Sequence, residues 1–147
     1  LSLSGKTQAL AANVNNHITT LLVACNNNAQ LFGSNLLYKF VFTDDFIRDI
    51  QFHYKSSMCD IKEDSVRTLK MGLRHAICGL AIGEGEVVYA LSASTRRLLI
   101  FTLPDMEKKL RKIDLLLSPT SEFPGHNLPG GNLLVSPHLK WLLSYAP

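Results

Sequence analysis

The first residues that could do chemistry are Gly5, Lys6 and Thr7, in the opening sequence LSLSGKTQAL. A Gly-Lys-Thr run closes the phosphate-binding loop of nucleotide-binding proteins, where backbone N–H groups hold the phosphates and the lysine reaches them. The full loop needs an earlier glycine, which would precede Leu1, and a helix after it, whereas residues 13–20 are mostly weak helix formers. We therefore expect residues 5–7 to form a hairpin turn between two apolar strands.

Two further pairs have the composition of a nucleophile and its base. They are Ser4 with His17, and Cys59 with His53. Neither pair stands in the strained strand–turn–helix context that exposes a catalytic nucleophile. A histidine in a turn and a histidine at a strand edge explain them better, so the sequence predicts no catalytic residue and no enzyme.

Metal and cofactor sites are not indicated either. The four aspartates Asp44, Asp45, Asp49 and Asp60 form a loose group, in which the first two are better explained as a turn, because Asp side chains bond their own backbone there. The three cysteines lack the spacing of zinc ligands, and we expect them to be small buried side chains in a reducing compartment. The predicted cofactor content is none.

The composition is that of one globular domain. The chain has 147 residues, of which 46% are hydrophobic and 18% charged, with a net charge of +3. This excludes a disordered chain and gives little support to nucleic-acid binding, although the cluster EKKLRK at residues 107–112 is basic. The apolar runs are shorter than the roughly 18 residues that a membrane helix needs. With no secretory leader in the given sequence, we expect the cytoplasm or the nucleus.

Short apolar runs between turn-forming residues dominate the chain and predict an antiparallel all-β fold. We expect strands in the runs 19–25, 36–42, 46–54, 76–82, 86–92, 97–103, 131–136 and 140–146. Residues 105–117 have a helix-like spacing, and residues 118–131, with three prolines, predict a surface loop. Trp141 begins a strand and is expected in the core.

Repeated hairpin patterns resemble the blades of WD-repeat β-propellers. LSLSGKTQALAA and LLVSPHLKWLLSYA are similar to the first hairpin of a blade, and LLVACNNNAQLF and VVYALSASTRRLLIFTLPD to the next hairpin. The chain lacks a Trp-Asp pair, and its Gly-His pair lies in the proline-rich loop. The resemblance implies a single propeller domain, or part of one, over residues 1–147, with a loop at 118–130. The blade pieces would be residues 1–16, 17–43, 44–72, 73–117 and 131–147.

The resemblance further implies a non-catalytic scaffold or adaptor subunit that binds proteins or peptides through its loops. A propeller would place several polar residues on one face, where arginine can bind carboxylates and asparagine can bind peptide backbone. These candidates for partner binding are Asn26, Asn27, Asn28, Asp44, Asp45, Arg74, His75, Arg96 and Arg97. Three alternatives stay open, namely the substrate-recognition subunit of a ubiquitin ligase, a propeller-type hydrolase and a nucleic-acid-binding module.

Overall fold

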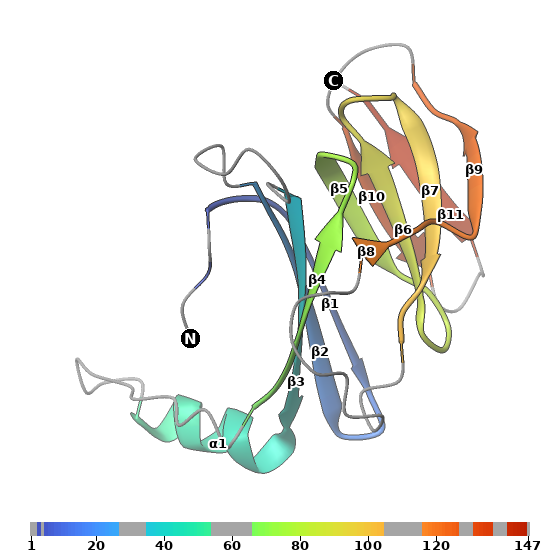
Figure 1. The fold of residues 1–147 in the computed structure, drawn as a ribbon. Helices are drawn as coiled ribbons and strands as arrows, with labels where there is room; N and C mark the ends of the chain where they lie inside the picture. The colour runs from blue at the N-terminus through green and yellow to red at the C-terminus, as the bar shows by residue number, and fades with distance from the viewer. Residues whose placement is uncertain are drawn as a thin grey trace.

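In its described residues the chain forms three mainly antiparallel β-sheets and one helix, as a computed structural model shows (Figure 1). The structure describes residues 3, 5–26, 35–53, 66–104, 116–126, 131–136 and 141–146. Their elements are β1 (Lys6–Asn15), β2 (Ile18–Asn26), β3 (Asn35–Thr43), α1 (Asp44–His53), β4 (Arg67–Leu73), β5 (Ile77–Ile82), β6 (Val87–Ser92), β7 (Arg97–Thr102), β8 (Leu116–Leu117), β9 (Ser121–Pro124), β10 (Asn132–Ser136) and β11 (Trp141–Tyr145). The predicted all-β class is confirmed.

The first sheet has the strand order β1-β2-β3-β4-β8. Its first four strands follow one another as an antiparallel meander, and β8 adds to β4 in parallel. The expected blade pieces 1–16, 17–43 and 44–72 thus contribute their strands to one sheet, and they do not form parts of three separate blades.

The second and third sheets contain hairpins that the sequence predicts. The second has the order β5-β6-β7-β9, and the third consists of β10 and β11. The hairpins β6–β7 and β10–β11 are confirmed, with antiparallel registers such as Val88↔Phe101 and Leu134↔Leu143. The expectation of a continuous loop over residues 118–130 is wrong in part, because β9 lies within it and pairs with β7.

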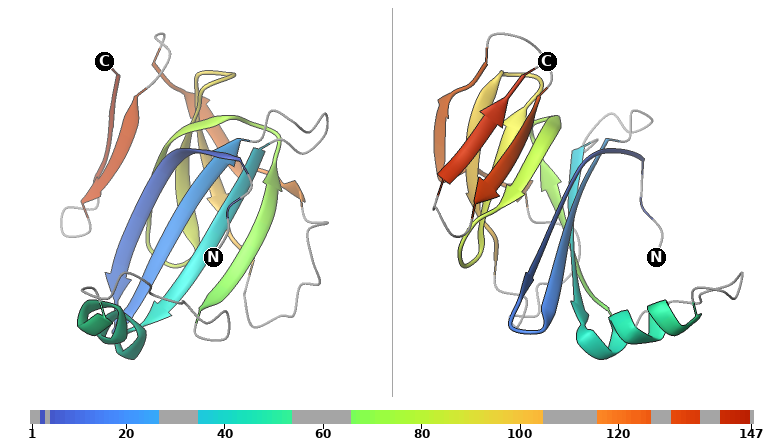
Figure 2. Two further views of the ribbon diagram at one scale, coloured as in Figure 1. Left: turned by 90° about the vertical axis from the view of Figure 1, so that its left-hand side faces the viewer. Right: turned by 180° about the vertical axis from the view of Figure 1, so that it is seen from behind.

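The three sheets stack face to face, and each contributes its first strand to a common side (Figure 2). β1 lies against β5, and β5 lies against β10. The largest hydrophobic cluster lies between the first two sheets and includes Leu22, Met71, Leu99 and Phe101, each at most 1% exposed. A smaller cluster around Leu133 joins the second sheet to the third. Burial of these apolar faces is the main force that holds the stack together.

Residues 44–53 form helix α1, so the strand expected over 46–54 is wrong. The Thr43 Oγ1 accepts a hydrogen bond of 3.4 Å from the Phe46 N–H, and Asp44 and Asp45 place negative charge in the first helical turn. The Phe46 ring stacks on Phe42 of β3 at 5.2 Å between ring centres. Phe46 and Ile47 of the helix pack against the face of the first sheet that is turned away from the second.

The stack has two ends, which we call upper and lower as they appear in Figure 1. The upper end holds Asn26, the β4–β5 connection at residues 74–76, the β6–β7 turn at 93–96, and residues 125–126 after β9. The lower end holds the β1–β2 turn at residues 16–17, the β5–β6 turn at 83–86 and the start of α1. Strands β1, β5 and β10 all run from the upper end to the lower end, so successive sheets repeat one orientation.

Candidate functional site

The Gly-Lys-Thr run does not form a phosphate-binding loop. Lys6 and Thr7 open strand β1, with Thr7 opposite Cys25, where the loop would require a helix. The hairpin turn expected at residues 5–7 is therefore also wrong. The hairpin turn after β1 is at Asn16 and His17, whose φ angles of 49° and 62° are those of a type I′ turn.

The structure describes only part of the two pairs whose residue types could form a nucleophile and its base. Ser4 and Cys59, and the side chain of His53, lie outside the described residues. His17 belongs to the lower end, where its Nδ1 lies 2.7 Å from the Asp44 Oδ2, and its side chain is 90% exposed. An exposed histidine paired with a carboxylate at a turn has no nucleophile to activate among the described groups around it.

The upper end brings together most of the residues that the sequence selected for partner binding. Arg74 and His75 form the connection from β4 to β5, and Arg96 ends the β6–β7 turn next to Arg97. Asn26 lies at the end of β2 and donates a hydrogen bond of 2.7 Å to the Asn35 side chain. Asn27 and Asn28 lie outside the described residues.

The β6–β7 turn is a rigid support for its two arginines. The Ser92 carbonyl accepts a 3.0 Å hydrogen bond from the Arg96 N–H, and the Ser92 Oγ accepts one of 3.1 Å from the Thr95 N–H. Arg96 has a φ of 54°, which closes the turn. Its carbonyl in turn accepts a 3.0 Å bond from the Gly125 N–H, so the segment after β9 is tied to the same turn.

Asp44 and Asp45 lie at the opposite end of the stack, and the prediction that they share a face with the arginines is wrong. β3 begins at the upper end and ends with Thr43 opposite Ile18, at the lower end. The two aspartates follow directly and form the first turn of α1. They act there as helix-terminal charges rather than as part of the upper surface.

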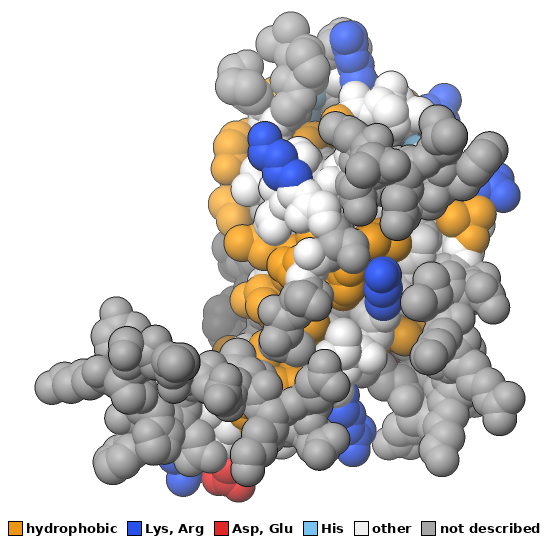
Figure 3. All heavy atoms as spheres, turned by 60° about the vertical axis from the view of Figure 1, so that its left-hand side comes forward, with side chains coloured by type: hydrophobic (Ala, Val, Ile, Leu, Met, Phe, Trp, Pro, Cys, Tyr) orange, Lys and Arg blue, Asp and Glu red, His pale blue; other side chains and the backbone are white. Residues whose placement is uncertain are grey.

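The two ends differ in their described charges, although Lys and Arg side chains occur at both (Figure 3). The described cations at the upper end are Lys6, Arg74, Arg96 and Arg97, accompanied by the acidic Glu122, which forms a 3.3 Å ion pair with Arg97. The described acidic side chains at the lower end are Asp44, Asp45, Glu84 and Glu86, and the basic Arg48 and Arg67 lie near them. An acidic segment of a partner would be attracted to the upper end and repelled from the lower one.

A groove follows the first strands of the three sheets. It has a volume of about 1070 Å³ and is lined by residues 10–15 of β1, 80–86 around the end of β5, and 132–135 of β10. These strands are the edges of their sheets, so their outward backbone groups are unpaired within the part of the chain that the structure describes. The groove is open, its walls carry both apolar and polar side chains, and Glu84 and Glu86 line its lower end.

Nothing in the described residues forms a metal centre. No group of three His, Cys, Asp or Glu side chains lies close enough together there to hold an ion. Burial raises the pKa of the Cys25 thiol, against a smaller lowering by the Thr7 side chain, and burial likewise raises the pKa of Cys78. Thiols with a raised pKa are poor nucleophiles. In the described ranges, no helix has the length and apolarity to cross a bilayer.

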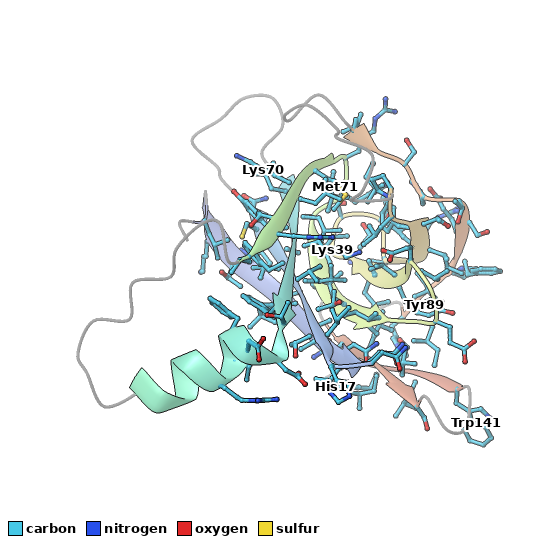
Figure 4. The ribbon with its side chains drawn as sticks, turned by 90° about the horizontal axis from the view of Figure 1, so that it is seen from below. His17, Lys39, Lys70, Met71, Tyr89 and Trp141 are labelled. Atoms are coloured by element: carbon cyan, nitrogen blue, oxygen red, sulfur yellow. The ribbon has the colours of Figure 1, made fainter. Side chains whose placement is uncertain are left out.

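Two features of the structure had no usable signal in the sequence. The buried ammonium of Lys39 pairs with Glu86 across the first two sheets, and these residues are 47 positions apart. Trp141, expected in the core, is 72% exposed and points away from the molecule (Figure 4), so that expectation is wrong. The apolar residues next to Trp141 in the sequence predict a strand, but they do not indicate which face of that strand is buried.

Comparison with known proteins does not assign the chain to a family. No family model matches the sequence, and none of the curated proteins matches it either.

Proposed function

We propose that this chain is a non-catalytic interaction module that binds a partner protein or peptide through the upper end of its stacked sheets. The observation that carries the proposal is the convergence of Arg74, His75, Arg96 and Arg97 at that end, on two connections that lie far apart in the sequence. Arginine makes bidentate hydrogen bonds to carboxylates, so an acidic partner segment is the expected ligand.

The arrangement of the sheets supports a WD-type propeller as the architecture of this module. A propeller places four-stranded meanders around an axis, with the first strand of each blade nearest to it. Strands β1 to β4 contain such a meander, and so does the sheet β5-β6-β7-β9. The first strands β1, β5 and β10 lie next to one another in that order. In this architecture the module acts as a rigid scaffold or adaptor subunit, with its loops as the binding groups.

A paired set of variants tests the proposal. The upper-end variant carries Arg74→Gln and Arg96→Asn, since asparagine tolerates the positive φ at position 96. The control carries Arg48→Gln and Arg67→Gln, which remove the same charge from exposed residues near the lower end. The tagged wild-type chain and both variants are used to capture proteins from lysate of the native cell, with and without nuclease treatment, and the captured proteins are quantified by mass spectrometry.

The proposal expects the partners of the wild-type chain to be reduced at least about fivefold with the upper-end variant and unchanged with the control. Equal capture by both variants would contradict it. Loss of binding on nuclease treatment alone would instead indicate that a nucleic acid is the ligand, because such binding depends on phosphate contacts.

A further inference from the structure

The third sheet has an apolar face that the described part of the chain leaves exposed, which we call the outer face of β10–β11. It comprises the side chains that alternate along the two strands with those packed on the second sheet, namely Leu134, Ser136, Trp141, Leu143 and Tyr145. Leu134, Trp141, Leu143 and Tyr145 are 57%, 72%, 59% and 48% exposed. The register pairs Leu134 directly with Leu143, so the exposed apolar groups form one contiguous patch.

The opposite face of the same two strands is buried against the second sheet. Leu133 is 2% exposed and packs with Ala81 and Leu91, and Val135 and Leu142 pack around them. Both strands therefore contain a continuous apolar run, LLV or WLL, in place of an alternation of apolar and polar residues. Such runs are typical of strands that are covered on both faces. The sequence of β10–β11 is therefore that of a middle layer, while the structure leaves it as an outer one (Figure 2).

We propose that a second copy of this chain covers the outer face, so that two β10–β11 sheets pack against each other in a symmetric dimer. The five side chains of the face carry no charge, so two identical faces meet without repulsion. Given the exposed fractions, the four apolar side chains offer about 450 Å² per copy. With their polar neighbours, the dimer buries about 1000 Å² in total, which is the lower limit of a specific interface.

An interface of this size gives a weak dimer, with an expected dissociation constant of about 10 µM. Trp141 is its expected anchor, because buried tryptophans contribute disproportionately to interface stability. The inference does not depend on the proposed function, since the outer face lies on β10–β11 and not at the upper end.

The chain contains a built-in reporter for this contact. Trp141 is its only tryptophan, so the tryptophan emission comes from the outer face alone. Between about 1 and 100 µM protein, sedimentation equilibrium should show a change from monomer to dimer. Over the same range the tryptophan emission should shift to shorter wavelength and become less accessible to acrylamide, because the indole leaves water.

Charged variants distinguish a specific dimer from nonspecific association of apolar surfaces. Leu143→Lys and Leu134→Lys place a charge in the face from two different strands and should each keep the chain monomeric with a concentration-independent emission. Both replaced side chains are exposed, so far-UV circular dichroism should be unchanged. The matched control is Val14→Lys, at a 68% exposed apolar residue of β1, which should leave the dimer intact.

Three results would overturn the inference. The first is a wild-type chain that stays monomeric at 100 µM. The second is dimerisation that persists in both lysine variants of the face. The third is equal loss of association in the Val14→Lys control, which would show that any apolar surface suffices.

Discussion

Lys39 and Glu86 join the first two sheets through an ion pair in which the lysine is buried and the glutamate is half exposed. Lys39 lies in the middle of β3, on the same face as the buried Leu37, and only 7% of its side chain is exposed. Glu86 belongs to the β5–β6 turn and reaches in from the lower end. The pair fixes the position of this turn relative to the first sheet, because a buried ammonium needs a hydrogen-bonding partner.

Removing the carboxylate alone should destabilise the fold. Glu86→Gln leaves the buried ammonium without its counter-charge, and we expect a loss of about 1–2 kcal/mol in the free energy of unfolding, since the glutamate is partly solvated. The double variant Lys39→Met with Glu86→Gln should recover most of that loss. Urea unfolding measures all three proteins. Glu84→Gln, at the exposed neighbour in the same turn, is the control, and an equal loss there would contradict the role of the pair.

Two glycines with positive φ should differ in their tolerance of alanine. At Gly131, with a φ of 119°, a Cβ would lie 2.4 Å from the Tyr145 carbonyl oxygen. At Gly85, with a φ of 66°, a Cβ would meet nothing within 4 Å. Gly85→Ala should therefore cost about 1 kcal/mol of backbone strain, and Gly131→Ala about 2–4 kcal/mol because β10 and β11 must also separate. Thermal unfolding of both variants compares them, and equal costs would show that the contact with Tyr145 is not close.

The buried thiol of Cys25 should make the fold less stable at alkaline pH. Burial raises the pKa of this thiol above its ordinary value of 9.0, so the folded state binds the proton more tightly than the unfolded state. The resulting stabilisation is fully present below pH 9 and is lost as the pH rises through the raised pKa. Urea midpoints between pH 7 and pH 11 should fall less steeply for Cys25→Ala than for the wild-type chain. Parallel curves for the two proteins would contradict this prediction.

Ionic strength should weaken partner binding at the upper end. Lys6, Arg74, Arg96 and Arg97 are all exposed there, and interactions between exposed charges are screened within about 10 Å at 0.1 M salt. Raising NaCl from 50 to 300 mM should reduce the association rate with a captured partner by about tenfold and change the dissociation rate less. Surface plasmon resonance with the purified partner measures both rates. Salt-independent association would show that the charges are not part of the interface.

The strands could be predicted from sequence because most of them are apolar runs with turn residues on both sides. β2, β3, β5, β6, β7, β10 and β11 fall within or close to the expected runs. β8 and β9 could not be predicted in this way, since they have two and four residues and form only because β4 and β7 offer free edges. Their pairing is a tertiary event and leaves little local pattern.

Helix α1 was missed because its apolar residues satisfy two patterns at once. Phe46, Ile50 and Phe52 alternate as in a strand, while Phe46, Ile47 and Ile50 also fit one face of a helix. The decisive signal was the Thr-Asp-Asp sequence at residues 43–45, which supplies a helix cap and acidic first-turn residues. When the same residues are interpreted as a turn, a strand is expected after them. That interpretation is the reason why Asp44 and Asp45 were predicted at the wrong end of the stack.

The upper end illustrates what sequence can contribute to a candidate site. Arg74 and Arg96 could be placed on one surface only because a meander returns every second connection to the same end. The ion pair of Arg97 with Glu122 could not be anticipated, because Glu122 stood in a segment expected to be a loop.

Hydrogen exchange of the chain, alone and bound to a partner purified from its native cell, tests the central proposal most directly. We predict slower amide exchange on binding in the upper-end connections at residues 74–76 and 92–97. The lower-end turns at residues 16–17 and 83–86 should be unchanged. Protection confined to the lower-end turns, with residues 74–76 and 92–97 unaffected, would contradict the proposal that partners bind at the upper end.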